Sequence, residues 1–180
     1  MARDIVYFDL ETKRTANDVG GWHNKHEMGI SVAVTFSTRL GEYRIYTEDE
    51  VQDLIKQLHQ ADLVVGYNHI SFDYEVLMAH TVMDLKDQIR SLDLMVELEK
   101  VLGHRIKLDA VASATLDGLS KTADGLDAIR WWQQGEILKI AEYCCFDVKV
   151  TKCVHEFGVA NGYVKYLDRT KRMQQAKVDW

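Results

Sequence analysis

The chain has 180 residues, of which 47% are hydrophobic and 28% are charged, the ordinary make-up of a globular domain. Its formal net charge of −6 argues against a protein that holds nucleic acid mainly through a basic surface. It does not exclude an enzyme that acts on nucleic acid, because a group of acidic metal ligands also lowers the charge of the bare chain. No run of residues approaches the ~20 apolar positions that span a bilayer, and the first residues lead directly into a strand pattern, so we expect a cytoplasmic protein without a membrane segment.

No feature of the sequence divides it into parts. Proline is absent, and no Gly/Ser-rich linker, internal repeat or low-complexity run occurs, so we expect one domain over residues 1–180. The three cysteines lack the spacing of a disulfide framework or a zinc site, and they fall in one helical segment. We expect them to be reduced residues in the core or at its boundary.

The N-terminal part predicts strands followed by a helix. Residues 5–10, 31–37 and 42–46 are rich in β-branched and aromatic side chains and are separated by turns. Three sequential strands with short connections indicate a meander. Residues 47–60 then combine an N-cap candidate, Thr47, with early acidic residues and apolar positions at helical spacing, which predicts a helix.

The remaining pattern alternates between strand and helix. The short apolar run at 62–66 predicts a buried strand, after which the chain turns at Asn68 and begins a helix near Ser71. A short strand at 89–92 follows. Four further segments have helical patterns: 94–102, 108–116, 126–133 and 137–157. A meander, then alternating elements, then helices predict an α/β fold with a mixed central sheet flanked by helices.

Two carboxylates extend the first predicted strand on one face. Strand alternation places Tyr7, Asp9 and Glu11 on the same side, while the other side is apolar. A carboxylate on a buried strand costs several kcal/mol unless another interaction compensates. The alternative is a strand end that turns out into solvent.

Two further acids occupy apolar helix faces. Asp73 begins an apolar stripe, although the helix dipole also favours an aspartate in a first turn. The other members of this stripe are Val76, Leu77 and His80. Asp147 occupies a core position of the last helix, with a place on the helix rim as the alternative. The apolar and aromatic residues on its face are Ile140, Tyr143, Val150 and Val154.

Four carboxylates in one place require cations. Two like charges ~4 Å apart repel by about 4 kcal/mol at an effective dielectric near 20, so a cluster would be destabilising or protonated without bound cations. Hard oxygen ligands select Mg²⁺ or Mn²⁺ over zinc, and two such ions suit phosphoryl chemistry. His23 and His26 also have a spacing found in metal sites, but no further ligands lie near them in the sequence.

At this point the sequence resembles a known family, the DEDD exonucleases, which include proofreading domains of DNA polymerases and ribonuclease D. Three stretches are similar to the family's motifs, in the family's order: 8–12, 66–73 and 143–147. Tyr143, with Glu142 where another branch has histidine, is similar to the tyrosine (DEDDy) branch. The segment 107–121 also resembles proofreading domains of family B polymerases and their stand-alone relatives.

The resemblance implies a ribonuclease-H-like fold and 3′-5′ exonuclease activity on DNA or RNA, with single-stranded 3′ ends preferred. It implies two divalent cations, Mg²⁺ or Mn²⁺, and four ligands for them: Asp9, Glu11, Asp73 and Asp147. Tyr143 would orient the attacking water, because a tyrosine with an ordinary pKa of about 10 is mostly protonated at neutral pH. Four residues are expected to contact the substrate: Thr12, Asn68, Phe72 and Lys121.

Two other functions stay open. One is a catalytically inactive ribonuclease-H-like module that binds nucleic acid or docks to a helicase or polymerase, which suits a small acidic chain. The other is endonuclease or resolvase-like cutting at the same site. The basic stretch 165–177 fits either a solvated face or a phosphate-facing patch. Trp131 and Trp132 are candidates for base stacking, although adjacent helix positions favour one buried and one exposed ring.

Overall fold

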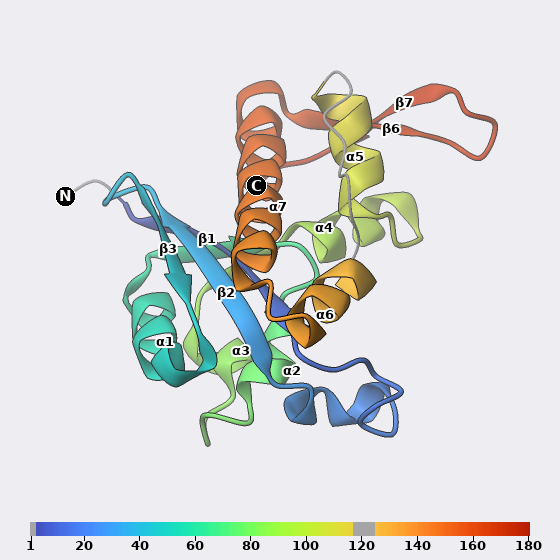
Figure 1. The fold of residues 1–180 in the computed structure, drawn as a ribbon. Helices are drawn as coiled ribbons and strands as arrows, with labels where there is room; N and C mark the ends of the chain where they lie inside the picture. The colour runs from blue at the N-terminus through green and yellow to red at the C-terminus, as the bar shows by residue number, and fades with distance from the viewer. Residues whose placement is uncertain (1–2, 117–124) are drawn as a thin grey trace.

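The computed structural model describes residues 3–116 and 125–180 (Figure 1). Its centre is a five-stranded mixed sheet with the order β3-β2-β1-β4-β5. The strands are β1 Ile5–Thr12, β2 Ile30–Ser37, β3 Glu42–Tyr46, β4 Leu63–Gly66 and β5 Ser91–Asp93. The first three form the expected antiparallel meander, and β4 and β5 run parallel to β1. The expectation of short connections is wrong between β1 and β2, which are joined by residues 13–29. The predicted α/β fold with a mixed sheet is confirmed.

Helices pack on this sheet, and most of them match the predicted segments. The α-helices are α1 Val51–Gln60, α2 Asp73–Leu77, α3 Leu85–Gln88, α4 Leu94–Leu102, α5 Leu108–Thr115, α6 Gly125–Gln133 and α7 Ile137–Asn161. Two 3₁₀ segments, η1 Trp22–Glu27 and η2 Glu48–Glu50, complete them. The expected stripe from Asp73 to His80 is wrong in its last member, because α2 ends at Leu77. The segments η1 and α3 were not predicted, since each is too short for a periodic pattern.

Alternation along β1 divides the core into two layers. Val6, Phe8 and Leu10 face the layer that contains α1 and α2. Tyr7, one position out of phase, faces the layer that contains α7. Helices therefore cover β1 on both faces, and its polar side chains have to be explained by something other than a strand face left open to solvent.

The C-terminal helix α7 runs along one face of the sheet for 25 residues and ends at Asn161, followed by the cap residue Gly162 with a left-handed φ of 72°. A hairpin of β6 Tyr163–Leu167 and β7 Met173–Lys177 follows. Figure 1 shows it projecting beyond α5, away from the sheet. This hairpin was not predicted as strands. Its two strands, YVKYL and MQQAK, lack the strict apolar and polar alternation of a half-buried strand.

The cysteines agree with the expectation from the sequence. All three are free: Cys144 is buried, and Cys145 and Cys153 are half-buried. In the part of the chain that the structure describes, no helix has both the length and the apolar character required to cross a membrane.

Candidate active site

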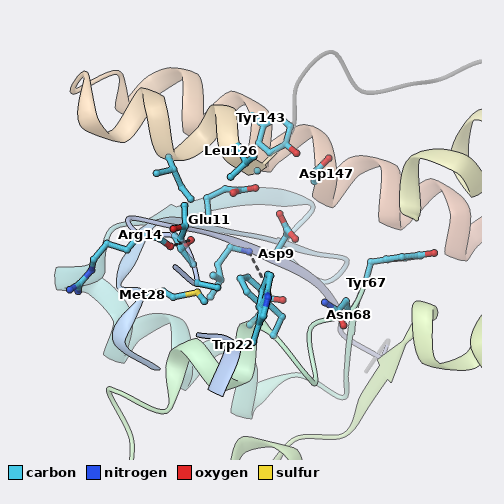
Figure 2. Close-up of a pocket in the computed structure, with 18 of the residues that line it drawn as sticks. Asp9, Glu11, Arg14, Trp22, Met28, Tyr67, Asn68, Leu126, Tyr143 and Asp147 are labelled. Carbon is cyan, nitrogen blue, oxygen red and sulfur yellow. Dashed lines mark hydrogen bonds between the residues drawn. The ribbon is translucent and has the colours of Figure 1, made fainter. Parts of the chain in front are cut away.

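Three carboxylates from β1 and α7 converge. Asp9, Glu11 and Asp147 each offer an oxygen, and these oxygens all lie within 4.8 Å of one another (Figure 2). Asp147 is only 4% exposed, while Asp9 and Glu11 are half-buried. Among the described residues this is the one group of three or more potential metal ligands, so His23 and His26 belong to no such group there.

The short length of β4 makes room for this cluster. On one side β1 pairs with β2 along its whole length, with Asp9 opposite Val34. On the other side the ladder to β4 ends at Tyr7. The acidic part of β1 therefore extends past the carboxyl end of its parallel neighbour, which is where open α/β sheets commonly bind ligands.

Asp73 occupies the place that β4 leaves. The backbone N–H of Leu10 donates a hydrogen bond to Oδ1 of Asp73 at 3.0 Å, which satisfies a buried donor next to Asp9. Asp73 is 2% exposed, and burial followed by the negative charge of Asp9 raises the pKa of its carboxyl well above the ordinary value. Asp73 lies outside the three-carboxylate group but lines the same pocket. Its role as a metal ligand stays a prediction.

Tyr143 lies one helical turn before Asp147 and lines the pocket. Burial and the negative charges of Asp147, Glu11 and Asp9 raise the pKa of its phenol, so it is protonated at neutral pH. The ring of Trp131 packs against it edge to face, with centroids 6.0 Å apart.

The expectation that Trp131 and Trp132 divide into one buried and one exposed ring is wrong, because both are half-buried and neither lines the pocket.

Cys144 is a neutral donor beside the acids. Its buried thiol donates to the carbonyl oxygen of Asp9 at 3.4 Å and lies 3.5 Å from Oδ2 of the same residue. Burial, followed by the charges of Asp9, Glu11 and Asp147, raises the pKa of this thiol. The group therefore stays a thiol and helps to orient Asp9.

A buried aspartate that the sequence analysis missed organises the loop after β4. Asp93 accepts the backbone N–H of Asn68 at 2.8 Å and that of Ile70 at 3.1 Å. It also caps α4 by accepting the N–H of Met95 at 3.1 Å. Asn68 has a left-handed φ of 65°, which these bonds hold in place. The available signal was an acidic residue directly before a helical pattern, which is typical of an N-cap.

The pocket above the carboxylates has a volume of about 710 Å³, within the usual range for ligand sites. Asn68, Phe72 and the buried Thr12 line it, and their role in substrate binding stays a prediction. The hydroxyl of Thr12 donates to the carbonyl of Arg14 at 3.0 Å. Toward a substrate, this hydroxyl can therefore act as a hydrogen-bond acceptor. Lys121, the fourth expected contact, lies outside the described residues.

Trp22 forms an aromatic wall that the sequence did not predict. It is 66% exposed, lines the pocket and packs edge to face on Phe72, with centroids 6.3 Å apart. Figure 2 shows it on the side of the pocket opposite Tyr143 and Asp147. Its segment between β1 and β2 has no periodic pattern, so no local signal connected Trp22 with the site.

The comparisons with known proteins agree with this geometry. The family model of the RNase_H superfamily matches residues 6–156. The chain belongs to the RNase_H superfamily. This membership supports a nuclease-type function, and hence contact with nucleic acid, and it fits an acidic cluster that could bind divalent metal.

A solved structure with a similar fold is that of the family B DNA polymerase from the hyperthermophilic archaeon Pyrobaculum calidifontis. The TM-score is 0.62 and the sequence identity 15%, over 88% of this chain and 25% of that chain. The chain thus spans about a quarter of that polymerase, and the likeness at this identity shows the fold. The search of curated proteins found no match to this sequence.

Proposed function

We propose that this superfamily member is a metal-dependent 3′-5′ exonuclease that hydrolyses phosphodiesters at single-stranded 3′ ends of DNA or RNA. The observation that carries the proposal is the convergence of Asp9, Glu11 and Asp147 with Tyr143 in one pocket. Membership of the RNase_H superfamily supports the nuclease class. The resemblance of the three motifs to the DEDDy exonucleases supports the direction of cleavage.

The donor set fits divalent cations. The group contains carboxylate oxygens only, which favours Mg²⁺ or Mn²⁺. Carboxylates this close repel one another, and a cation among them removes the repulsion. Asp9, Glu11 and Asp147 would hold the ions, with Asp73 contributing to the second. When bound, two such ions would activate a water and neutralise the leaving 3′-oxygen.

The remaining residues would position the reactants. Tyr143 keeps its proton and can donate to the attacking water or to a phosphate oxygen. Trp131 restricts the ring of Tyr143 through their edge-to-face contact. On the opposite wall, Trp22 and Phe72 offer apolar surface for the terminal base. These contacts would hold the last phosphodiester over the carboxylates.

Cleavage of end-labelled strands tests the proposal. Single-stranded DNA and RNA, labelled at the 3′ or the 5′ end, are incubated with the protein and Mg²⁺ or Mn²⁺. Asp147→Asn removes a buried carboxylate of the cluster, whereas Glu142→Gln removes an exposed one from the same helix. We expect mononucleotide release from the 3′ end by the wild type and by Glu142→Gln, and a loss of about 10²-fold or more in Asp147→Asn.

Two outcomes would contradict the proposal: no metal-dependent product from either polymer, or equal rates for Asp147→Asn and the wild type. A covalently closed circle separates exonuclease from endonuclease, because an exonuclease has no end from which to start. Thermal unfolding reports metal binding without catalysis. A cation at ~100 times its Kd stabilises the fold by about 2.7 kcal/mol, so Mn²⁺ should raise the Tm of Glu142→Gln much more than that of Asp147→Asn.

A further inference from the structure

The β6–β7 hairpin carries a charge opposite to that of the molecule. The segment 163–177 holds five of the 22 Lys and Arg residues of the chain but one of its 28 Asp and Glu residues. The five cations are Lys165, Arg169, Lys171, Arg172 and Lys177. The overall charge of −6 thus conceals a strongly basic arm on an acidic body.

These cations are available to a partner. Four of them are exposed and Lys165 is half-buried. None forms an ion pair with a described residue, unlike surface lysines such as Lys86 and Lys100, which pair with Glu75 and Glu97.

The one acid of the segment, Asp168, is occupied by the turn of the hairpin. Its carboxylate accepts the backbone N–H groups of Thr170 at 2.8 Å and Arg172 at 3.0 Å, and the side-chain amide of Gln174 at 3.0 Å. It therefore organises the turn and forms no ion pair with the cations around it.

The hairpin has a fixed base and an exposed end. Val164 and Ala176 are cross-strand partners and both are buried in the core. Lys165 exchanges backbone hydrogen bonds with the hydroxyl of Thr115 at 3.0 and 3.1 Å. Farther out, the cross-strand pair Leu167 and Met173 is 52% and 54% exposed. Apolar surface between cations suits a ligand that presents both bases and phosphates.

Helix α5 connects this arm to the pocket. Near the beginning of α5, the hydroxyl of Tyr67, which lines the pocket, donates to the carbonyl of Ile106 at 2.7 Å. Ile106 lies two residues before the first residue of the helix. At its end, Thr115 holds β6. Lys107, between them, is exposed. The hydrogen bonds of Tyr67 and Thr115 thus join the pocket, α5 and the hairpin.

From this arrangement we infer that the β6–β7 hairpin binds the phosphate backbone of the single strand upstream of its 3′ end. The inference rests on the proposed function and names the surface that would hold the polymer. An acidic body repels a polyanion, so a basic arm that contacts several phosphates supplies the attraction that the pocket lacks. Hairpin contacts would govern the affinity for long strands and leave the chemistry of the terminal nucleotide unchanged.

Binding in EDTA tests the inference apart from cleavage. Fluorescence anisotropy with long single-stranded DNA and RNA compares the wild type with a hairpin variant in which all five cations are replaced by Gln. The control variant replaces five exposed cations on other surfaces in the same way, at Arg44, Lys56, Lys86, Lys100 and Lys149. We expect the hairpin variant to bind about tenfold or more weakly at low salt. Its slope of log K against log salt should become shallower by about 0.7 for each phosphate that the hairpin no longer neutralises.

Kinetics gives a second measurement. We expect the hairpin variant to raise the KM for a long strand severalfold and to hydrolyse a dinucleotide at the wild-type rate, because a dinucleotide occupies only the pocket.

Three results would overturn the inference: equal decreases of affinity in both variants, no binding of DNA or RNA by the wild type, or hairpin-dependent binding to phosphatidylserine vesicles only. Absence of cleavage with hairpin-dependent binding would contradict the proposed activity and leave the inference supported.

Discussion

The protonation state of Tyr143 depends on burial and on three carboxylates that come from two distant parts of the chain. Burial and the charges of Asp147, Glu11 and Asp9 all oppose ionisation of the phenol, which raises its pKa. A phenol that keeps its proton acts through a directed hydrogen bond, and it does not act as a base. In the proposed hydrolysis, Tyr143 would therefore assist at neutral pH without losing its proton.

Substitution of Tyr143 by Phe removes that hydrogen bond and keeps the ring that packs on Trp131. We expect kcat on labelled single strands to fall by about 10²-fold, with KM and Tm close to the wild-type values, because the interaction concerns the reacting water. Tyr43→Phe, on the exposed strand β3, is the matched control and should change none of the three. An unchanged kcat in Tyr143→Phe would show that the phenol has no part in the reaction.

Periodicity predicted where the individual acids lie, whereas their grouping was expected only from the resemblance of the motifs. Asp9, Glu11, Asp73 and Asp147 occupy the strand and helix positions that periodicity assigned to them. Whether each carboxylate points at another, or at a backbone N–H as Asp73 does at Leu10, depends on how two segments pack. Trp22 was missed for the same reason, since its partner Phe72 lies far away in the sequence.

At the scale of elements, the end of β4 determines where the site can form. Gly66 closes the strand and its Cα lies against His69, so a Cβ at this position would lie 2.7 Å from Cγ of the imidazole. His69 is fully buried, and its ring packs edge to face against Tyr74, with centroids 5.0 Å apart. The turn that leads to Asn68 and Asp73 therefore depends on the absence of a side chain at Gly66.

Gly66→Ala should destabilise the fold by about 1–3 kcal/mol, because the added methyl overpacks a closed region. Urea unfolding of Gly66→Ala, His69→Ala and the double variant forms a cycle that isolates this contact. We expect the double variant to be more stable than the sum of the single effects requires, by about 1 kcal/mol or more. Additive effects would mean that the ring of His69 does not cause the strain.

Elements with a clear period were predicted within a few residues, whereas the hairpin β6–β7 was not. Helix α7 buries one face along its whole length, and that face is visible as a spacing of three and four. The hairpin buries chiefly Val164 and Ala176, and its remaining residues, polar and apolar, follow no alternating pattern. Its strand pairing comes from the turn at Asp168 and from docking against α5.

For the whole molecule, two buried histidines couple stability to pH. Burial lowers the pKa of His69 and of His155 to about 4, against an ordinary value of 6.5. Between about pH 4 and pH 6.5 the folded state keeps both rings neutral, whereas the unfolded chain protonates them below pH 6.5. Unfolding therefore binds protons between about pH 6.5 and 4, and stability is lost as the pH falls through that window.

His155→Gln tests this coupling. The Nδ1 atom of His155 lies 2.8 Å from the hydroxyl of Tyr7, an interaction that an amide can reproduce without titrating. In EDTA, we expect the wild type to lose about 2 kcal/mol more than His155→Gln when the pH falls from about 7 to about 5, as urea unfolding would measure. Asp73, whose raised pKa acts in the opposite direction, contributes equally to both proteins. Parallel losses in the two proteins would show that His155 does not titrate on unfolding.

The sequence by itself determined the α/β fold, the meander, most of the helices and the acids that occupy apolar faces. These are local properties, because a strand or helix period is repeated within a few residues. Only the tertiary structure decided that Asp9, Glu11 and Asp147 converge while Asp73 binds the backbone of β1, that β4 stops short of them, and that a basic hairpin stands beyond α5. Each of these depends on contacts between segments far apart in the chain, for which a single sequence carries no local pattern.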